Sequence, residues 1–224
     1  MKKAFTLSEV LIALTIIGVI AAITVPALLQ STQKVELETA FKKQYSTLKQ
    51  AVEKIKMEDS LEFTYEIYAA QFKKRLASEY IELKDCGSIN GNTGCVVQED
   101  DGSFSYYKTF NGNTLSRSYF DDGGFITNDG TTFFIEQGNQ AKNTIGAYIV
   151  SIDVNGYAKG PNRMGRDLFM FQITEDGDVL PMGAKNTYWY SNRTSYCSRS
   201  SSSSYNGFTC AYYAATDKDY FKKF

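Results

Sequence analysis

Histidine is absent from this chain of 224 residues, and its absence excludes several classes of enzyme site. Ser-His-Asp and Cys-His catalytic arrangements need an imidazole, and so does a histidine-ligated zinc site. The phosphate-binding motifs G-x-x-x-x-G-K-[ST] and G-x-G-x-x-G are also missing. No C-x-x-C pair occurs, which argues against a zinc ribbon or a thioredoxin-type site. We therefore expect a protein that is not an enzyme.

A strong charge of one sign is missing as well. The formal net charge is −1, so no basic patch dominates the sequence. Five cations gather near the C-terminus, but they are too few to predict DNA binding: Arg193, Arg199, Lys218, Lys222 and Lys223. The composition therefore gives no strong nucleic-acid signal.

What the sequence does contain is a long apolar run from Val10 to Leu29. Only Thr15, Gly18, Thr24 and Pro26 interrupt its apolar character. A helix of this length reaches about 30 Å, which is the thickness of the hydrocarbon core of a bilayer. The run is longer than the core of an ordinary secretory signal, and no clear A-x-A cleavage site follows it. We expect a single membrane-spanning helix.

A carboxylate, Glu9, stands at the start of this run. Such a group costs roughly 2.5–3.5 kcal/mol in a membrane unless it is partnered, and it marks a function by default. Thr6 to Glu9 also fits the S/T-x-x-E capping box of a helix N-terminus. Lys2 and Lys3 precede the run, so the positive-inside rule places the N-terminus in the cytoplasm.

These first residues resemble the class III signal of type IV pilins and type II secretion pseudopilins. In that family a prepilin peptidase cuts off a short basic leader, and the new N-terminal residue is then N-methylated. The resemblance implies that residues 1–4 are the leader, that cleavage falls between Ala4 and Phe5, and that Phe5 is methylated. Ala4 departs from the glycine that the family most often has before the cut.

The resemblance also implies roles for Glu9 and Pro26 in assembly. In the family, the glutamate pairs with the α-amine of a neighbouring subunit, and a proline at this distance lies where the helix loosens during assembly. The partners would be identical or related pilin subunits, the prepilin peptidase, an inner-membrane assembly platform and membrane lipid. Four small residues would allow helices to approach closely: Ala13, Gly18, Ala21 and Ala22.

Three functions remain open at this stage. The first is a structural subunit that is cleaved, methylated and polymerised into a type IV pilus-like or type II secretion filament. The second is a minor pilin that acts as a binding module for DNA, surfaces or a secreted substrate. The third is a simple membrane-anchored envelope protein. All three place one helix in the inner membrane and the remaining head, residues 58–224, in the periplasm. The filament functions then place the protein in a pilus or pseudopilus, or at the cell surface.

The remaining sequence predicts an α+β fold of the pilin type. The apolar segment 5–29 continues as the amphipathic segment 30–57 of the same helix, because apolar residues recur at three- and four-residue steps. Residues 58–224 form one head, which begins with a second helix predicted over Ser60–Leu83. Pro26 removes one helical hydrogen bond and should kink or loosen the helix.

Beyond this helix, short aromatic and β-branched runs alternate with turn signals such as Asp-Gly and Asn-Gly. Gly124–Thr127 and Thr131–Gln137 are predicted to pair around Asn128–Gly130. Ile145–Asp153 and Leu168–Thr174 are the strongest predicted strands. We expect an antiparallel sheet of four to six strands that packs on the second half of the long helix.

Four cysteines occur in a head that would meet oxidising conditions. We expect the local pairs Cys86–Cys95 and Cys197–Cys210, although four cysteines allow two other connectivities. The second pair encloses a serine-rich segment among tyrosines, a composition typical of adaptable binding surfaces. Tyrosines that pack beneath a mobile serine loop are the alternative interpretation.

The segment from Asp153 to Asp167 resembles the D-x-N-G…P-N…G-x-D loop found in the heads of many pilin-like proteins. Asp153, Asn155 and Asp167 could supply part of a calcium shell, because Ca²⁺ takes carboxylate and amide oxygens. The EF-hand pattern fails, however, since Met164 stands where glutamate is needed. The favoured interpretation is a structural loop in which these side chains bond the backbone, and we expect no other cofactor.

Overall fold

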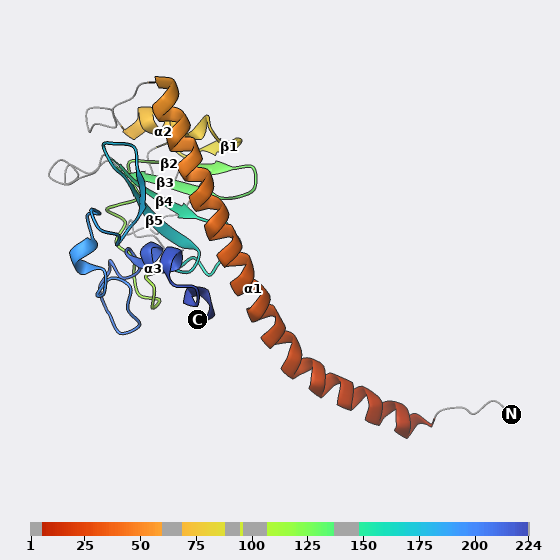
Figure 1. The fold of residues 1–224 in the computed structure, drawn as a ribbon. Helices are drawn as coiled ribbons and strands as arrows, with labels where there is room; N and C mark the ends of the chain where they lie inside the picture. Colours follow the sequence, from red (N-terminus) through yellow and green to blue (C-terminus); the bar gives the residue numbers. More distant parts are fainter. Residues whose placement is uncertain (1–5, 60–68, 88–94, 96–106, 137–147, 224) are drawn as a thin grey trace. The chain divides into compact units, whose positions relative to one another are not determined.

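The computed structural model describes residues 6–59, 69–87, 95, 107–136 and 148–223, and Figure 1 shows their fold. The chain separates into two compact units, Met1–Glu36 and Leu37–Phe224. Helix α1 (Leu7–Asp59) begins in the first unit and ends in the second. The second unit contains the sheet.

Within the second unit, α1 buries one stripe of side chains. Leu37, Phe41, Leu48, Val52 and Ile55 follow one another at helical spacing and are all buried in the core. This spacing places them on one side of a helix, while the intervening positions are mostly polar and exposed. The stripe predicted from the sequence is therefore confirmed.

The second unit contains a six-stranded antiparallel sheet whose spatial order follows the sequence. Each strand pairs with the next along the chain, so the sheet is a simple meander. Its strands are β1 (Glu82–Asp85), β2 (Gly123–Thr127), β3 (Thr132–Glu136), β4 (Tyr148–Asp153), β5 (Leu168–Ile173) and β6 (Val179–Pro181). The predicted α+β fold with an antiparallel sheet is confirmed.

Alternate residues of the strands pack into two separate cores, one on each face of the sheet. In β3, Phe133 and Ile135 join the core that includes α1, whereas Phe134 joins the opposite one. In β5, Phe169 and Met170 divide between the two cores in the same way. Because both faces are covered, the central strands are apolar at almost every position.

The hairpin between β2 and β3 is held against α1 by polar contacts. Gln44 is buried and donates to the hydroxyl oxygen of Thr131 at 2.8 Å. Lys43 Nζ lies 2.8 Å from Asp129 Oδ2 in the turn. Burial raises the pKa of Asp129, but hydrogen bonds from Lys43, Thr127 and Thr131 outweigh that effect and hold the pKa well below its usual range. The turn therefore carries an ionised carboxylate that helps to fix it on the helix.

The second predicted helix is shorter than the sequence analysis expects. Helix α2 covers Ala69–Ala77, while residues 60–68 lie outside the described part. The prediction was wrong at the C-terminal end, because the chain turns after Ala77 and enters β1 at Glu82. There the backbone forms the edge strand β1, which pairs with β2, and Tyr80 packs beside Phe133 with ring centroids 4.7 Å apart. Sheet pairing outweighs the helical periodicity here.

Two short helical segments complete the C-terminal part. Helix α3 (Cys210–Thr216) packs on β5 and β6 and adds Cys210, Ala211 and Ala214 to the core that includes α1. The 3-10 turn η3 (Tyr220–Lys223) follows it and buries Tyr220 and Phe221. Another 3-10 turn, η2 (Tyr190–Asn192), has no buried residue.

Candidate functional site

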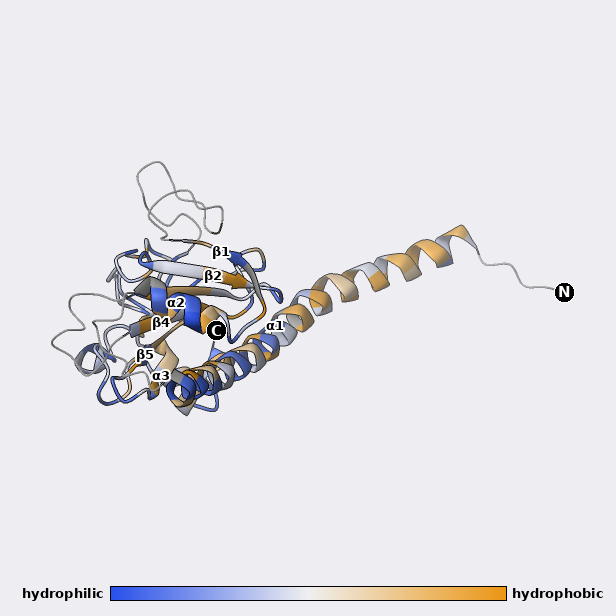
Figure 2. Ribbon diagram, turned by 90° about the horizontal axis from the view of Figure 1, so that it is seen from above, coloured by the Kyte–Doolittle hydropathy of each residue, from blue (hydrophilic) through white to orange (hydrophobic). Residues whose placement is uncertain are grey.

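The apolar part of α1 is uncovered in the single chain. Large side chains from Leu7 to Leu29 are exposed, for example Leu14 at 61% and Ile23 at 70%. Figure 2 shows this part of the helix as mostly hydrophobic. Among the described residues, one helix is long and apolar enough to cross a membrane, and none of its most apolar window is buried. Burial of each such side chain away from water is favourable by roughly 1.5–3 kcal/mol of free energy, so this surface needs an apolar environment.

The two threonine hydroxyls inside the apolar run form hydrogen bonds within the helix. Thr15 Oγ1 donates to the carbonyl of Leu11 at 2.8 Å, and Thr24 Oγ1 donates to that of Ile20 at 2.9 Å. Back-bonding of this kind removes the need for water around a hydroxyl group. The run is therefore compatible with lipid or with a tightly packed helix interface.

Glu9 forms the predicted capping box with Thr6. The backbone N–H and the hydroxyl of Thr6 both donate to Glu9 Oε2 at 2.8 Å, and the Glu9 N–H donates to Thr6 Oγ1 at 3.3 Å. The other oxygen, Oε1, receives no hydrogen bond from the described residues. The cap thus orients the carboxylate and leaves one oxygen available. Ala4 and Phe5, which flank the expected cleavage site, lie outside the described residues.

Pro26 and Gly18 are the two unusual residues within this part of the helix. Helix α1 continues through Pro26 without an interruption. A Cβ atom placed on Gly18 would have no heavy atom within 4 Å. Nothing in the single chain therefore requires glycine at this position, whereas a close partner helix would.

The loop from Asp153 to Asp167 is folded around its own two carboxylates. Asp153 Oδ1 accepts from the N–H of Gly156 at 2.9 Å, and Asp153 Oδ2 accepts from the hydroxyl of Tyr107 at 2.6 Å. Asp167 accepts from the N–H groups of Asn162 and Arg163 at 2.6 and 2.7 Å. Tyr107 and Asn162 are thus further hydrogen-bond donors to the two carboxylates, and no local pattern predicts the contact of Tyr107, which lies 46 residues from Asp153 in the chain. The arrangement matches the favoured structural interpretation of the loop.

The predicted calcium ligands lie in one region of this loop. Asp153 and Asp167 are both fully buried, and burial raises the pKa of each carboxyl; for Asp153, repulsion from Asp167 adds to the effect. Asn155 donates through Nδ2 to the carbonyl of Gly160 at 2.8 Å, while its Oδ1 is buried and accepts no hydrogen bond from the described residues. Calcium binding stays a prediction. Removal of calcium with a chelator should lower the unfolding temperature if an ion is bound, and an unchanged temperature would contradict it.

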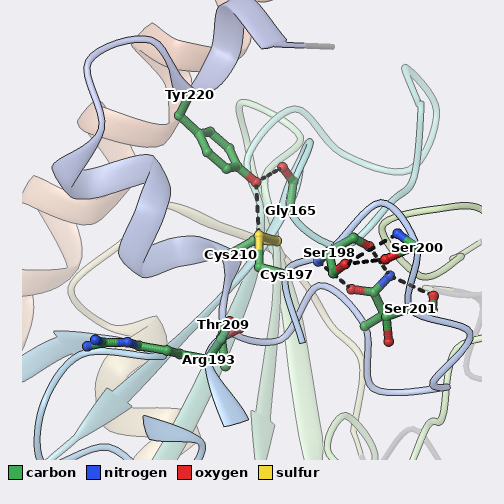
Figure 3. The surroundings of a disulfide bond; sticks show 10 residues. Gly165, Arg193, Cys197, Ser198, Ser200, Ser201, Thr209, Cys210 and Tyr220 are labelled. Carbon is green, nitrogen blue, oxygen red and sulfur yellow. Dashed lines mark hydrogen bonds between the residues drawn. A yellow bond between two sulfur atoms is a disulfide. The ribbon is translucent and has the colours of Figure 1, made fainter. Parts of the chain in front are cut away.

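Both disulfides follow the local pairing that the sequence analysis expects, Cys86–Cys95 and Cys197–Cys210. The second one packs directly against the Asp153–Asp167 loop, as Figure 3 shows. A Cβ atom on Gly165 would lie 2.7 Å from Cys210 Sγ, so this position accepts only glycine. Tyr220 donates to the carbonyl of Gly165 at 2.5 Å. The Asp153–Asp167 loop and the segment closed by the Cys197–Cys210 disulfide, which are separate features of the sequence, therefore pack against each other.

The serine-rich segment is anchored by Asn206, a residue that no sequence pattern predicts for this role. Asn206 is fully buried, and its Nδ2 donates to the carbonyls of Ser198 and Ser201 at 2.8 and 3.1 Å. Its Oδ1 accepts from the N–H of Ser198 at 3.1 Å. The aromatic residues around this segment pack on one another, with Trp189 stacked on Tyr205 at 5.6 Å between ring centroids. The segment is therefore anchored by specific hydrogen bonds.

Three acids meet at the end of β3. Asp121, Asp122 and Glu136 place one carboxylate oxygen each within 4.8 Å of one another. Burial raises the pKa of Glu136 to about 9, and repulsion from Asp122 and Asp121 adds to the effect. With its pKa raised to this value, the buried Glu136 carboxyl carries a proton near pH 7. The proton removes the charge from the buried member of the cluster, since Asp121 is half-buried and Asp122 is exposed.

Comparison with known proteins gives one result for the N-terminus. Residues 1–25 match the prokaryotic N-terminal methylation motif, which is the type IV pilin and pseudopilin signal. No curated protein and no solved structure matches the chain significantly. The motif covers the expected cleavage site, Glu9 and most of the exposed apolar helix. The motif indicates a pilin-like substrate of prepilin processing that is anchored in a membrane. It suggests a structural subunit rather than an enzyme.

Proposed function

We propose that this chain is a structural subunit that is cleaved between Ala4 and Phe5, methylated at Phe5 and polymerised into a type IV pilus-like or type II secretion filament. The match of residues 1–25 to the methylation motif is the observation that carries the proposal. The same motif implies that a prepilin peptidase processes the chain and that other pilin subunits are its partners. An inner-membrane platform then assembles the processed chains.

The exposed apolar helix supports an assembly role. Before assembly, lipid covers the side chains between Leu7 and Leu29, with the N-terminus cytoplasmic and the second unit in the periplasm. In the filament, the same side chains pack against the helices of other copies. Repetition of one such contact produces an open helical fibre. The vacant space around Gly18 suits close helix packing.

The geometry at Glu9 supports a pairing between subunits. Cleavage before Phe5 creates an α-amine, and methylation keeps its positive charge. Oε1 of Glu9 is open among the described residues and can accept from this amine on an adjacent copy. A paired carboxylate avoids the cost of an isolated charge in lipid, so docking of a processed neighbour is favourable and its register is fixed.

Replacement of Glu9 by glutamine tests this function, because the variant keeps the size and loses the charge. We expect Glu9→Gln to be inserted and cleaved normally but to be depleted from sheared fibres. Glu36→Gln is the matched control, since Glu36 is an exposed glutamate on the same helix outside the apolar run. It should enter fibres at the wild-type level. Normal incorporation of Glu9→Gln would refute the pairing.

A membrane-anchored envelope protein that never assembles is the competing function. It predicts that the leader stays attached in cells that have an active prepilin peptidase. A cleaved leader and depletion of Glu9→Gln from fibres together would exclude that function.

A further inference from the structure

A cavity of about 400 Å³ lies on the second unit, and four cations line it. They come from segments that are far apart in the chain: Arg163 and Arg166 from the loop before β5, Arg199 from the serine-rich segment and Lys223 from η3. Phe110 and Asn111 complete the lining. The volume lies within the range of roughly 300–1,000 Å³ that is usual for sites of small ligands.

The segments that carry these arginines are held by specific contacts. The N–H of Arg163 donates to Asp167, and the guanidinium of Arg163 lies over Gly112, where a Cβ atom would be 3.1 Å from Nη2. Asn111, which also lines the cavity, donates through Nδ2 to the carbonyl of Ser201 at 2.5 Å. Asn206 and the Cys197–Cys210 disulfide fix the backbone on either side of Arg199. The arginines therefore stand on an ordered scaffold.

The charge of this cavity is positive. Among the described residues, no carboxylate forms an ion pair with Arg163 or Arg199, and Lys223 pairs with Asp217. Arg163, Arg166 and Arg199 line the cavity together, so three guanidinium groups lie close to one another. The fold thus brings like charges together at a cost that an anionic ligand would relieve.

We propose that this cavity, which we call the arginine pocket and define by Arg163, Arg166, Arg199 and Lys223, binds a phosphate group. Guanidinium groups match the geometry of phosphate oxygens through paired hydrogen bonds, and a phosphate carries enough charge for more than one of them. A single carboxylate would satisfy only one guanidinium. The arginine pocket is independent of the assembly helix and gives the second unit a binding role.

The surroundings leave room for the rest of a phosphorylated molecule. A second cavity of about 180 Å³ shares Phe110, Arg199 and Lys223 with the arginine pocket. Tyr213 and Tyr220 line this second cavity. Aromatic rings beside a phosphate site suit a ligand whose phosphate carries an apolar or ring-shaped group. Such a phosphate can come from a free phosphate compound or from the backbone of a nucleic acid.

The test uses the full-length processed chain in detergent. Pyrophosphate is titrated at constant ionic strength while the fluorescence of Trp189, the single tryptophan, reports the unfolding temperature. A short fluorescein-labelled oligodeoxynucleotide is titrated separately, and its anisotropy is recorded. The variant Arg163→Gln/Arg199→Gln removes two charges from the arginine pocket, and the control Lys185→Gln/Lys218→Gln removes two exposed charges elsewhere.

We expect pyrophosphate to raise the unfolding temperature of the wild type, and the pocket variant to bind it about tenfold or more weakly. The lysine control should bind like the wild type. Tighter binding of the oligonucleotide, lost in the same variant, would identify a nucleic-acid backbone as the source, whereas binding of pyrophosphate alone would identify a free phosphate compound. Chloride at the same ionic strength is the salt reference. The proposal is overturned if pyrophosphate raises the unfolding temperature no more than chloride does and the oligonucleotide does not bind. It is also overturned if the pocket variant and the lysine control lose equal affinity.

Discussion

Truncation of Phe41 tests how the second half of α1 is attached to the sheet. Its ring is 1% exposed and lies 4.6 Å from the ring of Phe169 and 5.8 Å from that of Phe221, measured between centroids. Removal of a buried phenylalanine side chain costs about 3–5 kcal/mol, which includes the cavity left behind. We expect Phe41→Ala to lower the free energy of unfolding by about 4 kcal/mol. For a unit of this size, the unfolding temperature should fall by about 8–16 °C.

The assay is thermal unfolding of the full-length chain in detergent, followed by the fluorescence of Trp189. Met57→Ala is the control, because Met57 lies on the same helix and is 76% exposed. An exposed position of this kind should change stability by less than about 0.5 kcal/mol. A loss below about 1 kcal/mol for Phe41→Ala, equal to that of the control, would refute the packing of this helix face on β5.

Three further predictions concern other parts of the chain. The folded state keeps a proton on Glu136 up to a pH of about 9, whereas the unfolded chain loses it near pH 4.5. The free energy of unfolding should therefore fall as the pH rises between these values. Glu136→Gln should flatten this pH dependence of the unfolding temperature, and an equally steep slope would contradict the raised pKa. Gly18→Leu should leave the unfolding temperature unchanged but reduce recovery in sheared fibres, and normal recovery would exclude close helix packing there. Replacement of Cys197 and Cys210 by serine should lower the free energy of unfolding in urea by about 3 kcal/mol, because the disulfide closes a loop with a sequence separation of 13 residues. An unchanged urea midpoint would show that hydrogen bonds alone hold the loop.

The sequence predicted those parts of the fold in which local pattern and packing agree. The stripe from Leu37 to Ile55 lies on the core as its helical spacing requires. The turn signal Asn128–Gly130 stands between β2 and β3, and the strongest strand patterns became β4 and β5. Each of these features depends on residues that are close in the sequence, which is why a pattern could reveal them.

Long-range contacts decided the features that the sequence could not predict. The helical periodicity of the sequence continues through residues 78–83, but residues 82–85 pair with β2 and form a strand of the sheet. The arginine pocket combines the loop at Arg163, the serine-rich segment at Arg199 and the C-terminal turn at Lys223, so no local motif marks it. The same is true of Tyr107, which reaches Asp153 from a distant segment.

Mass spectrometry of the native protein, recovered from membranes and from sheared fibres, tests the central claim of processing and assembly most directly. We expect a chain that begins at an N-methylated Phe5, lacks residues 1–4 and is present in the fibre fraction. A chain that still begins at Met1 in cells with an active prepilin peptidase would contradict it.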